Sequence, residues 1–364
     1  MRILFYNCVY RPGHMYFDTK MIEYLSDISE QLVVLQPDNW FQVHKSNIVY
    51  SNCELPQNNT AKFKRFSTWT ISTNNSLKAI RKIKQFDPDV VVIGEYELST
   101  FGITIPLLRA ACSKIVVVNH NNIDQLAKYG LKRLMFNWYK NKIYHCTLEP
   151  FIKEYAQKCL GVREDRVFCW PHPAEPMKSQ MSKKDYKKEK ANTSLKVDII
   201  GLSQSNDERF IQSLIRQEIE NSVFKNNNLH VVLKSKEVSF DDGFLTVIKG
   251  WIDIDTYDDY YNNTCGVLVA FPSTFQYRVS ATLIEAIRDN IQVLGSDIEL
   301  MRYYNKEYPN ICKIYCEESF VNDLLCLQKA NSLKQKDEFE SFMTRHSDTY
   351  ICNIMLQDLR HLVY

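Results

Sequence analysis

The chain has 364 residues, of which 45% are hydrophobic and 24% charged, and its formal net charge is +2. This length exceeds what one hydrophobic core usually fills, so the sequence predicts two domains. The small net charge gives no basic field for nucleic acid, and no run of about eighteen apolar residues predicts a transmembrane helix. The beginning of the chain does not resemble a signal peptide, and eleven cysteines without a CxxC pair are typical of a reducing cytosol. We therefore expect a cytoplasmic globular protein.

Apolar runs alternate with helical patterns through the first half of the chain. The predicted strands are Ile3–Val9, Gln31–Leu35, Val90–Gly94, Lys114–Asn119, Ile143–Cys146 and Arg166–Trp170. The predicted helices are Tyr16–Ile28, Ser76–Gln85, Ser99–Cys112, Ile123–Asn141 and Glu149–Leu160. Several strands are apolar throughout, as expected when both faces of a parallel sheet are covered, so the pattern indicates an α/β fold.

A proline-rich segment, 171–176, interrupts this alternation because proline continues neither a helix nor a central strand. A polar, lysine-rich stretch follows, and the alternation then begins again. The predicted strands are Lys196–Gly201, Leu229–Leu233, Phe244–Ile248, Gly266–Phe271, Ile291–Gly295 and Ile311–Tyr315. The predicted helices are Asp207–Asn221, Thr256–Asn263, Ser280–Asp289, Asp297–Tyr304 and Glu317–Ala330.

The two patterns predict four parts of the chain. These are an N-terminal Rossmann-like domain (1–172), a linker (173–194), a second Rossmann-like domain (195–340) and a C-terminal helical segment (341–364). The last segment has the amphipathic spacing of a helix that packs back on a core, and we expect it to lie on the N-terminal domain.

The stretch 271–287 could hold a nucleotide without the usual glycine motifs, since neither GxGxxG nor GxxxxGK[ST] occurs. A buried strand ends there and Ser280 is a good N-cap, so free N–H groups would gather at the carboxyl edge of a sheet. Arg278 could bind a diphosphate and Glu285 could accept hydrogen bonds from ribose hydroxyls, with Thr282 in the first helical turn. The alternative is an ordinary helix with a serine cap and a surface arginine.

This stretch resembles the donor-site motif of retaining GT-B glycosyltransferases (group 1, family 4-like), in which a Pro-Ser turn leads into a glutamate-bearing helix. The resemblance covers 244–304 well and the rest of the chain more loosely. It implies two Rossmann-like domains facing across a cleft, with a UDP- or GDP-sugar on the second domain and the acceptor on the first. It also implies retention of anomeric configuration, and neither a catalytic metal nor another cofactor.

Two positions depart from the pattern of that family. The family usually carries two glutamates; Glu285 would be the second, and Tyr277 stands where the first belongs. In that family an arginine and a lysine also follow the first strand of the donor domain, and neither occurs at the matching position of this sequence. Arg209 and Lys234 are candidates to substitute for them, and Arg278 is the better candidate.

Residues elsewhere match the family by position. His120 follows a strand and corresponds to a histidine near the donor sugar, so we take it, with Arg278, as a candidate catalytic residue; a structural histidine is the alternative. Gly13, in the loop 10–14, would give a special backbone shape near donor or acceptor. Glu95 is a candidate to line the same cleft. The alternative for Gly13 is an ordinary connecting loop, and the alternative for Glu95 is a surface role.

Three further features each have a competing interpretation. Trp251 and Ile252 would lie beside the nucleobase, unless the tryptophan belongs to the core. Asp253 and Asp255 form an Asp-X-Asp pattern, which binds metal in another glycosyltransferase fold, but we interpret them as helix-capping residues. The basic, aromatic segment 128–144 could lie on an anionic membrane, or it could pack its aromatic side chains into the core.

The sequence thus predicts a metal-independent glycosyltransferase that moves a sugar from a nucleotide sugar to a glycan or lipid-linked acceptor. Surface polysaccharide or glycoconjugate synthesis would be its setting, with peripheral contact to the membrane and no nucleic acid partner. The alternatives are a catalytically silent protein that binds a nucleotide sugar or a partner, and a GT-B-fold sugar-nucleotide epimerase.

Overall fold

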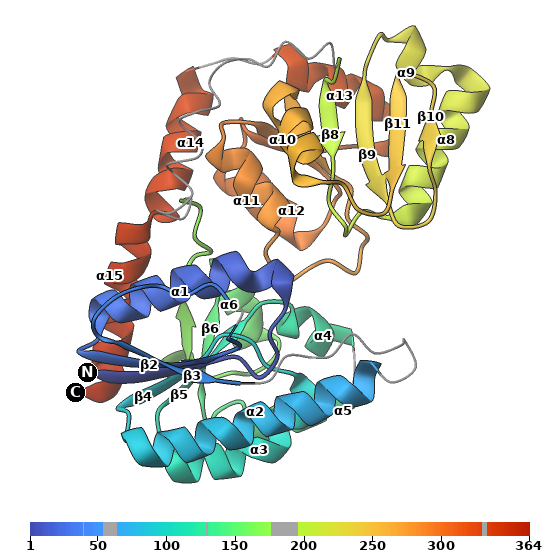
Figure 1. Ribbon diagram of the computed structural model, residues 1–364. Helices are drawn as coiled ribbons and strands as arrows, with labels where there is room; N and C mark the ends of the chain where they lie inside the picture. The colour runs from blue at the N-terminus through green and yellow to red at the C-terminus, as the bar shows by residue number, and fades with distance from the viewer. Residues whose placement is uncertain (39, 54–63, 129, 176–195, 330–332) are drawn as a thin grey trace. The chain divides into compact units, whose positions relative to one another are not determined.

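The computed structural model describes residues 1–38, 40–53, 64–128, 130–175, 196–329 and 333–364 (Figure 1). The chain forms two compact units. Unit 1 comprises Met1–Met177, Tyr277–Val279 and Arg345–Tyr364, and unit 2 comprises Lys178–Gln276 and Ser280–Thr344. Most of the predicted linker lies outside the described residues.

Unit 1 is built on a parallel sheet with the strand order β3-β2-β1-β4-β5-β6-β7 among the described residues. Its strands are β1 (Arg2–Tyr6), β2 (Gln31–Gln36), β3 (Ile48–Asn52), β4 (Val90–Ile93), β5 (Ile115–Asn119), β6 (Tyr144–Thr147) and β7 (Val167–Cys169). The chain turns from one side of β1 to the other between β3 and β4. The neighbouring carboxyl ends of β1 and β4 therefore form a switch point, where α/β sheets bind ligands.

Helices cover both faces of this sheet. They are α1 (Met15–Ile28), α2 (Lys64–Phe86), α3 (Leu98–Ala111), α4 (Asn122–Lys128), α5 (Gly130–Tyr139), α6 (Pro150–Lys158) and α15 (Asp348–Val363), with short turns η1 (Pro12–His14) and η2 (Glu164–Arg166). Alternate residues of β1 face opposite cores: Leu4 and Tyr6 pack with α2, α3 and α5, whereas Ile3 and Phe5 pack with α1 and α15.

The C-terminal segment packs on unit 1, as its spacing predicts. Ile351, Met355 and Leu359 on α15 are buried against the same core as α1 (Figure 1). An ion pair joins the two helices, because the fully buried amine of Lys20 lies 2.8 Å from Asp348 Oδ2. The pair also satisfies a lysine that would be very costly to bury alone.

Unit 2 repeats the architecture with the order β10-β11-β9-β8-β12-β13-β14. Its strands are β8 (Ile199–Gly201), β9 (Val231–Ser235), β10 (Phe240–Asp241), β11 (Leu245–Lys249), β12 (Gly266–Val269), β13 (Gln292–Gly295) and β14 (Cys312–Ile314). Its helices are α8 (Glu208–Asn221), α9 (Val223–Asn226), α10 (Ile254–Asn263), α11 (Ala281–Arg288), α12 (Glu299–Glu307), η3 (Glu317–Ser319), α13 (Phe320–Lys329) and α14 (Leu333–Arg345), which ends at the first residue of the last unit 1 segment. The pair β10–β11 is antiparallel, and the other strand pairs of this sheet are parallel.

Every predicted strand is present, most of them shorter than predicted, whereas β3 and β10 were not predicted. β3 lies at the sheet edge and is half exposed, so its side chains are mixed in character and give no apolar run. β1 ends at Tyr6 rather than at Val9, which places Asn7 in the loop beyond the strand. The helix predicted at Ser76–Gln85 begins earlier, at Lys64, because tertiary packing overrides a start rich in serine and threonine.

Candidate functional site

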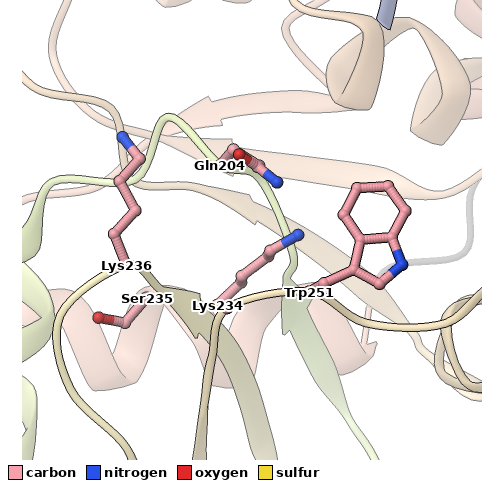
Figure 2. A pocket seen from close by; sticks show the side chains of 6 residues that line it. Gln204, Lys234, Ser235, Lys236 and Trp251 are labelled. Atoms are coloured by element: carbon pink, nitrogen blue, oxygen red, sulfur yellow. The ribbon is translucent and has the colours of Figure 1, made fainter. Parts of the chain in front are cut away.

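A cavity of about 290 Å³ lies at the carboxyl edge of the sheet of unit 2 (Figure 2). Its walls come from the ends of β8, β9 and β11, and it is lined by Gln204, Lys234, Ser235, Lys236, Gly250 and Trp251. The sequence singled out Lys234 and Trp251, whereas Gln204, Ser235 and Lys236 were missed because each lies outside any recognised motif.

Lys234 and Trp251 face each other in this cavity. The Lys234 amine lies 5.3 Å from the centre of the Trp251 ring and points toward it in Figure 2. Lys234 is only 9% exposed, and burial lowers its pKa. No ion pair joins Lys234 to a described residue. A buried cation beside an aromatic face suits an anion joined to a planar ring.

Trp251 is 81% exposed, so the alternative of a core tryptophan is wrong. Gly250 before it has a φ of +89°, a conformation that residues with side chains rarely adopt, and its N–H donates to Ser235 O at 3.0 Å. This turn projects the indole ring outward from the end of β11. Ile252, by contrast, is buried and belongs to the support of the loop.

The helix after β12 begins as predicted. Ser280 is the N-cap of α11, and its Oγ accepts a hydrogen bond from Leu283 N at 3.3 Å. Thr282 lies half-buried in the first turn. Glu285 accepts a hydrogen bond from the Tyr257 hydroxyl at 3.2 Å, which ties α11 to α10. A contact from Glu285 to ribose remains a prediction.

Arg278 and Tyr277 pack within unit 1, where Asp124 of α4 holds both. The Arg278 Nε lies 2.8 Å from Asp124 Oδ2, and Tyr277 N donates to Asp124 Oδ1 at 2.7 Å. The Tyr277 ring also stacks on Tyr155, with 3.6 Å between ring centres. Sequence reasoning missed Asp124, which lies inside a predicted helix. The binding of a diphosphate by Arg278 remains a prediction.

A second group of polar side chains lies at the carboxyl ends of β1, β4 and β5 in unit 1. We call Arg11, His14, Asp18, Glu95 and His120 the histidine–carboxylate cluster. Glu95 is 5% exposed; its Oε1 meets Arg11 Nε at 2.9 Å and its Oε2 meets His14 Nδ1 at 3.1 Å. The structure thus brings the loop 10–14, Glu95 and His120 together, whereas Asp18 was not singled out from the sequence.

The backbone of Gly94 brings these segments close to one another. A Cβ at this position would lie 2.4 Å from Asn7 Oδ1 and 2.8 Å from the Phe5 ring, so a side chain here would force Asn7 or Phe5 to shift. Its carbonyl oxygen lies 3.1 Å from His120 Nε2. The His120 ring also packs against His14, with 4.7 Å between ring centres, and against Phe17 at 4.4 Å.

Burial and charge set the protonation states of the cluster. Burial lowers the pKa of His120 well below the ordinary histidine value, and the neighbouring His14 lowers it further. Burial would lower the pKa of His14 too, but the hydrogen bond and charge of Glu95 outweigh it, so that this pKa is raised. Burial raises the pKa of Asp18 to about 7. At neutral pH, His120 is therefore uncharged.

Two details differ from what the sequence predicts. Gly13 lies in η1 with an ordinary backbone, and the glycines with positive φ among the described residues are Gly161, Gly243 and Gly250. In the Asp-X-Asp pattern, Asp253 is the N-cap of α10 and accepts from Thr256 N at 2.9 Å. Because this helix begins at Ile254, Asp255 lies in its first turn and does not cap it.

The basic, aromatic segment has some aromatic side chains in the core and others exposed, so each of its two interpretations fits part of it. Phe136 and Tyr139 on α5 are buried in the core of unit 1. Leu131, Leu134 and Trp138 are exposed, at a spacing that places them on one helix face, and the Lys142 amine lies 4.1 Å from the Trp138 ring centre. No helix among the described residues is long and apolar enough to cross a membrane.

Comparison with known proteins identifies the fold. No protein-family model and no curated protein matches the sequence. A UDP-forming α,α-trehalose-phosphate synthase from Burkholderia xenovorans matches with a TM-score of 0.63 at 10% identity, over 100% of this chain and 99% of that one. A trehalose-6-phosphate protein from E. coli bound with UDP-2-fluoro glucose gives 0.63 at 10%, over 99% of each chain. A glycosyltransferase from Rickettsia africae gives 0.58 at 11%, over 100% and 98%.

These neighbours are GT-B glycosyltransferases, and the chain shares their fold. The expected α/β architecture with two parallel-dominated sheets is confirmed. At about a tenth of residues identical, the likeness establishes the fold alone.

Proposed function

We propose that this chain is a glycosyltransferase that moves a sugar from a nucleotide-sugar donor to a hydroxyl-bearing acceptor. The observation that carries the proposal is the cavity of unit 2, where Lys234 and Trp251 combine a buried cation with an exposed aromatic face. The fold supports it, since one structure that shares this fold is bound with UDP-2-fluoro glucose.

In this proposal, the nucleobase packs on Trp251 and the phosphates meet Lys234. The N-terminus of α11, capped by Ser280, supplies further positive potential at the same sheet edge. Arg278 would add a charge-assisted contact only by leaving or sharing its present partner Asp124. UDP- and GDP-sugars are the donors that the sequence resemblance favours, with a glycan or lipid-linked acceptor.

A panel of UDP-, GDP- and CDP-sugars tests the proposal by thermal shift, because a ligand that binds the folded state raises its stability by mass action. At least one donor should raise the melting temperature of the parent, and Trp251→Ala should diminish the shift. The exposed indole makes this variant safe for folding. Absence of a shift with every donor contradicts the proposal. Binding without nucleotide release would favour a silent binding protein, and conversion of the donor sugar without acceptor would favour an epimerase.

We also propose that transfer is independent of metal. Asp253, the first aspartate of the Asp-X-Asp pattern, already caps α10 through Thr256. Activity should therefore survive EDTA and the Asp253→Asn change. Loss of turnover on chelation that Mn²⁺ restores would overturn this part of the proposal.

A lipid-linked acceptor would bring the protein to a membrane, and α5 carries the surface for such contact. Leu131, Leu134 and Trp138 form an exposed apolar face, with basic residues such as Lys142 beside it. This combination suits an anionic lipid surface. Anionic liposomes should retain the protein at low salt and release it as salt rises, and Leu134→Ser should weaken retention. Equal retention on neutral vesicles, or none on either, would contradict this proposal.

A further inference from the structure

We propose that Ser235 and Glu208 are positioning residues of the unit 2 cavity: they hold Lys234 and Trp251 at the spacing that a nucleotide needs and do not bind the nucleotide themselves. This role rests on the proposed function, because it takes a nucleotide as the ligand of the cavity. Both side chains belong to unit 2, and neither was singled out from the sequence.

Ser235 joins the cation of the cavity to its aromatic ring. It directly follows Lys234 at the end of β9 and is 2% exposed. Its carbonyl oxygen accepts a hydrogen bond from Gly250 N at 3.0 Å, and Gly250, with its positive φ, sets the direction of Trp251. A displacement of Ser235 would therefore move both groups that we expect the nucleotide to contact.

The hydroxyl of Ser235 has no hydrogen-bonding capacity left for a ligand. It donates to Glu208 Oε2 and accepts from Glu237 N and Val238 N, both at 3.0 Å. A serine hydroxyl has one hydrogen and two lone pairs, so these three bonds saturate it. In Figure 2 the hydroxyl also points away from Trp251. Ser235 thus lines the cavity but acts on a ligand through its neighbours.

Glu208 anchors the end of β9 to α8. Its other oxygen, Oε1, accepts a hydrogen bond from Lys236 N at 2.8 Å, so one carboxylate holds Ser235 and the residue after it. The helix itself is fixed by Ile211 and Leu214, which are buried in the core of unit 2. Hydrogen bonds to a carboxylate are stronger than those between neutral groups. The end of β9 therefore takes its position from a packed helix.

Asn206 fixes the other side of Lys234. Its Nδ2 donates to Lys234 O at 3.1 Å and to Gly201 O at 2.7 Å, which ties the end of β9 to the end of β8. The backbone of Lys234 is thus held from both directions, while its amine extends into the cavity (Figure 2). Groups that are already ordered do not have to be immobilised when a ligand arrives, so a preorganised site binds more tightly.

Calorimetry with UDP and GDP tests this role. Ser235→Ala should weaken the affinity by about 3- to 10-fold, the effect expected when one side chain must be ordered on binding. Glu208→Ala should also weaken it, and the double variant should lose no more than Glu208→Ala alone, because the two residues act through one hydrogen bond. Glu208→Gln keeps one acceptor oxygen and should lose less than Glu208→Ala.

Trp251 supplies a readout that needs no ligand. The fluorescence anisotropy of its indole is the difference between a variant and the same variant with Trp251→Ala. It should fall in Ser235→Ala, because the ring then moves more freely. Gln212→Ala is the matched control: Gln212, one turn after Glu208 on α8, donates from Nε2 to Glu237 Oε2 at 3.2 Å. This contact involves neither carboxylate nor hydroxyl of the proposed pair, so affinity and anisotropy should not change.

Unchanged affinity in Ser235→Ala, additive losses in the double variant, or an anisotropy that does not fall would each overturn the inference. Urea unfolding shows which variants fold, and if Ser235→Ala does not, Glu208→Gln carries the same comparison with a smaller expected loss. Failure of the parent to bind any nucleotide contradicts the proposed function instead, and the anisotropy still decides whether Ser235 positions the indole. The two failures are therefore distinguishable.

Discussion

The carboxyl edges of the two sheets differ in whether their buried charged side chains are paired. In unit 1, Arg11 and His14 both contact the buried carboxylate of Glu95, so these three groups are paired. In unit 2, Lys234 is buried beside Trp251, and no carboxylate among the described residues pairs with it. A paired group is held in a fixed direction by its partner. A buried cation without a counter-ion carries a desolvation cost that an incoming anion would relieve.

The buried carboxyl group of Asp18 in unit 1 should make the stability of the protein depend on pH. Burial raises the pKa of Asp18 from 3.8 to about 7, so the folded protein holds a proton that the unfolded chain releases. Stability is then fully present below the unfolded pKa and is lost as pH rises toward about 7. The loss should approach about 1.4 kcal/mol per pH unit inside this window. Urea unfolding at several pH values should show this slope in the parent and a flatter one in Asp18→Asn; equal slopes would contradict it.

Loss of the cation in unit 2 should weaken nucleotide binding. Lys234→Ala should cost roughly 1.5–3 kcal/mol in the affinity for UDP or GDP, as is typical of a charge-assisted contact. Calorimetry measures this difference. Lys236→Ala is the matched control, since that lysine lines the same cavity but is exposed and should matter less. An equal effect of both changes would indicate a general field rather than a defined phosphate contact.

Close packing at the edge of unit 1 gives a prediction for stability. Gly94→Ala should destabilise the protein by about 1–3 kcal/mol, because the new methyl group would overlap Asn7 and Phe5. Gly13→Ala tests the exposed loop beside it, where no atom lies within 4 Å of an added Cβ, and should be almost neutral. Chemical denaturation compares the two. Similar losses would mean that the edge is not packed as described.

The smallest effect is expected at Asp253, the N-cap of α10 in unit 2. Asp253→Ala removes the cap of α10 and should cost about 1 kcal/mol of unfolding free energy, whereas Asp253→Asn should cost much less because asparagine also caps well. Thermal unfolding of both variants measures the difference. If both changes destabilise equally, the aspartate does something other than cap the helix.

The sequence predicted best where a polar residue ends an apolar run. Glu95 and His120 were noticed because they follow buried strands, and both lie in the cluster. Asp18 and Asp124 were missed because each lies inside a helix, where a single acid looks like surface charge. The burial of an individual helical residue depends on tertiary packing, which local periodicity does not resolve.

The same limit explains the partners of predicted residues. Arg278 was expected to await a diphosphate, but its contact with Asp124 joins positions 154 residues apart in the chain, and no local pattern encodes such a pair. The outward direction of Trp251 is easier to understand in retrospect, because Gly250 before it supplies a positive φ. A glycine directly before an aromatic residue at a strand end was the available signal.

Unit 1 is assembled from distant segments of the chain, and this has a consequence for folding during synthesis. Helix α15 follows unit 2 in the chain, yet it buries Ile351, Met355 and Leu359 in unit 1 and brings Asp348 to the buried amine of Lys20. A ribosome must therefore synthesise all of unit 2 before the first unit to emerge has all its described parts. Until then, the surface of α1 that α15 covers is open to water and to chaperones, and a nascent chain stalled in unit 2 would be the form most exposed to aggregation.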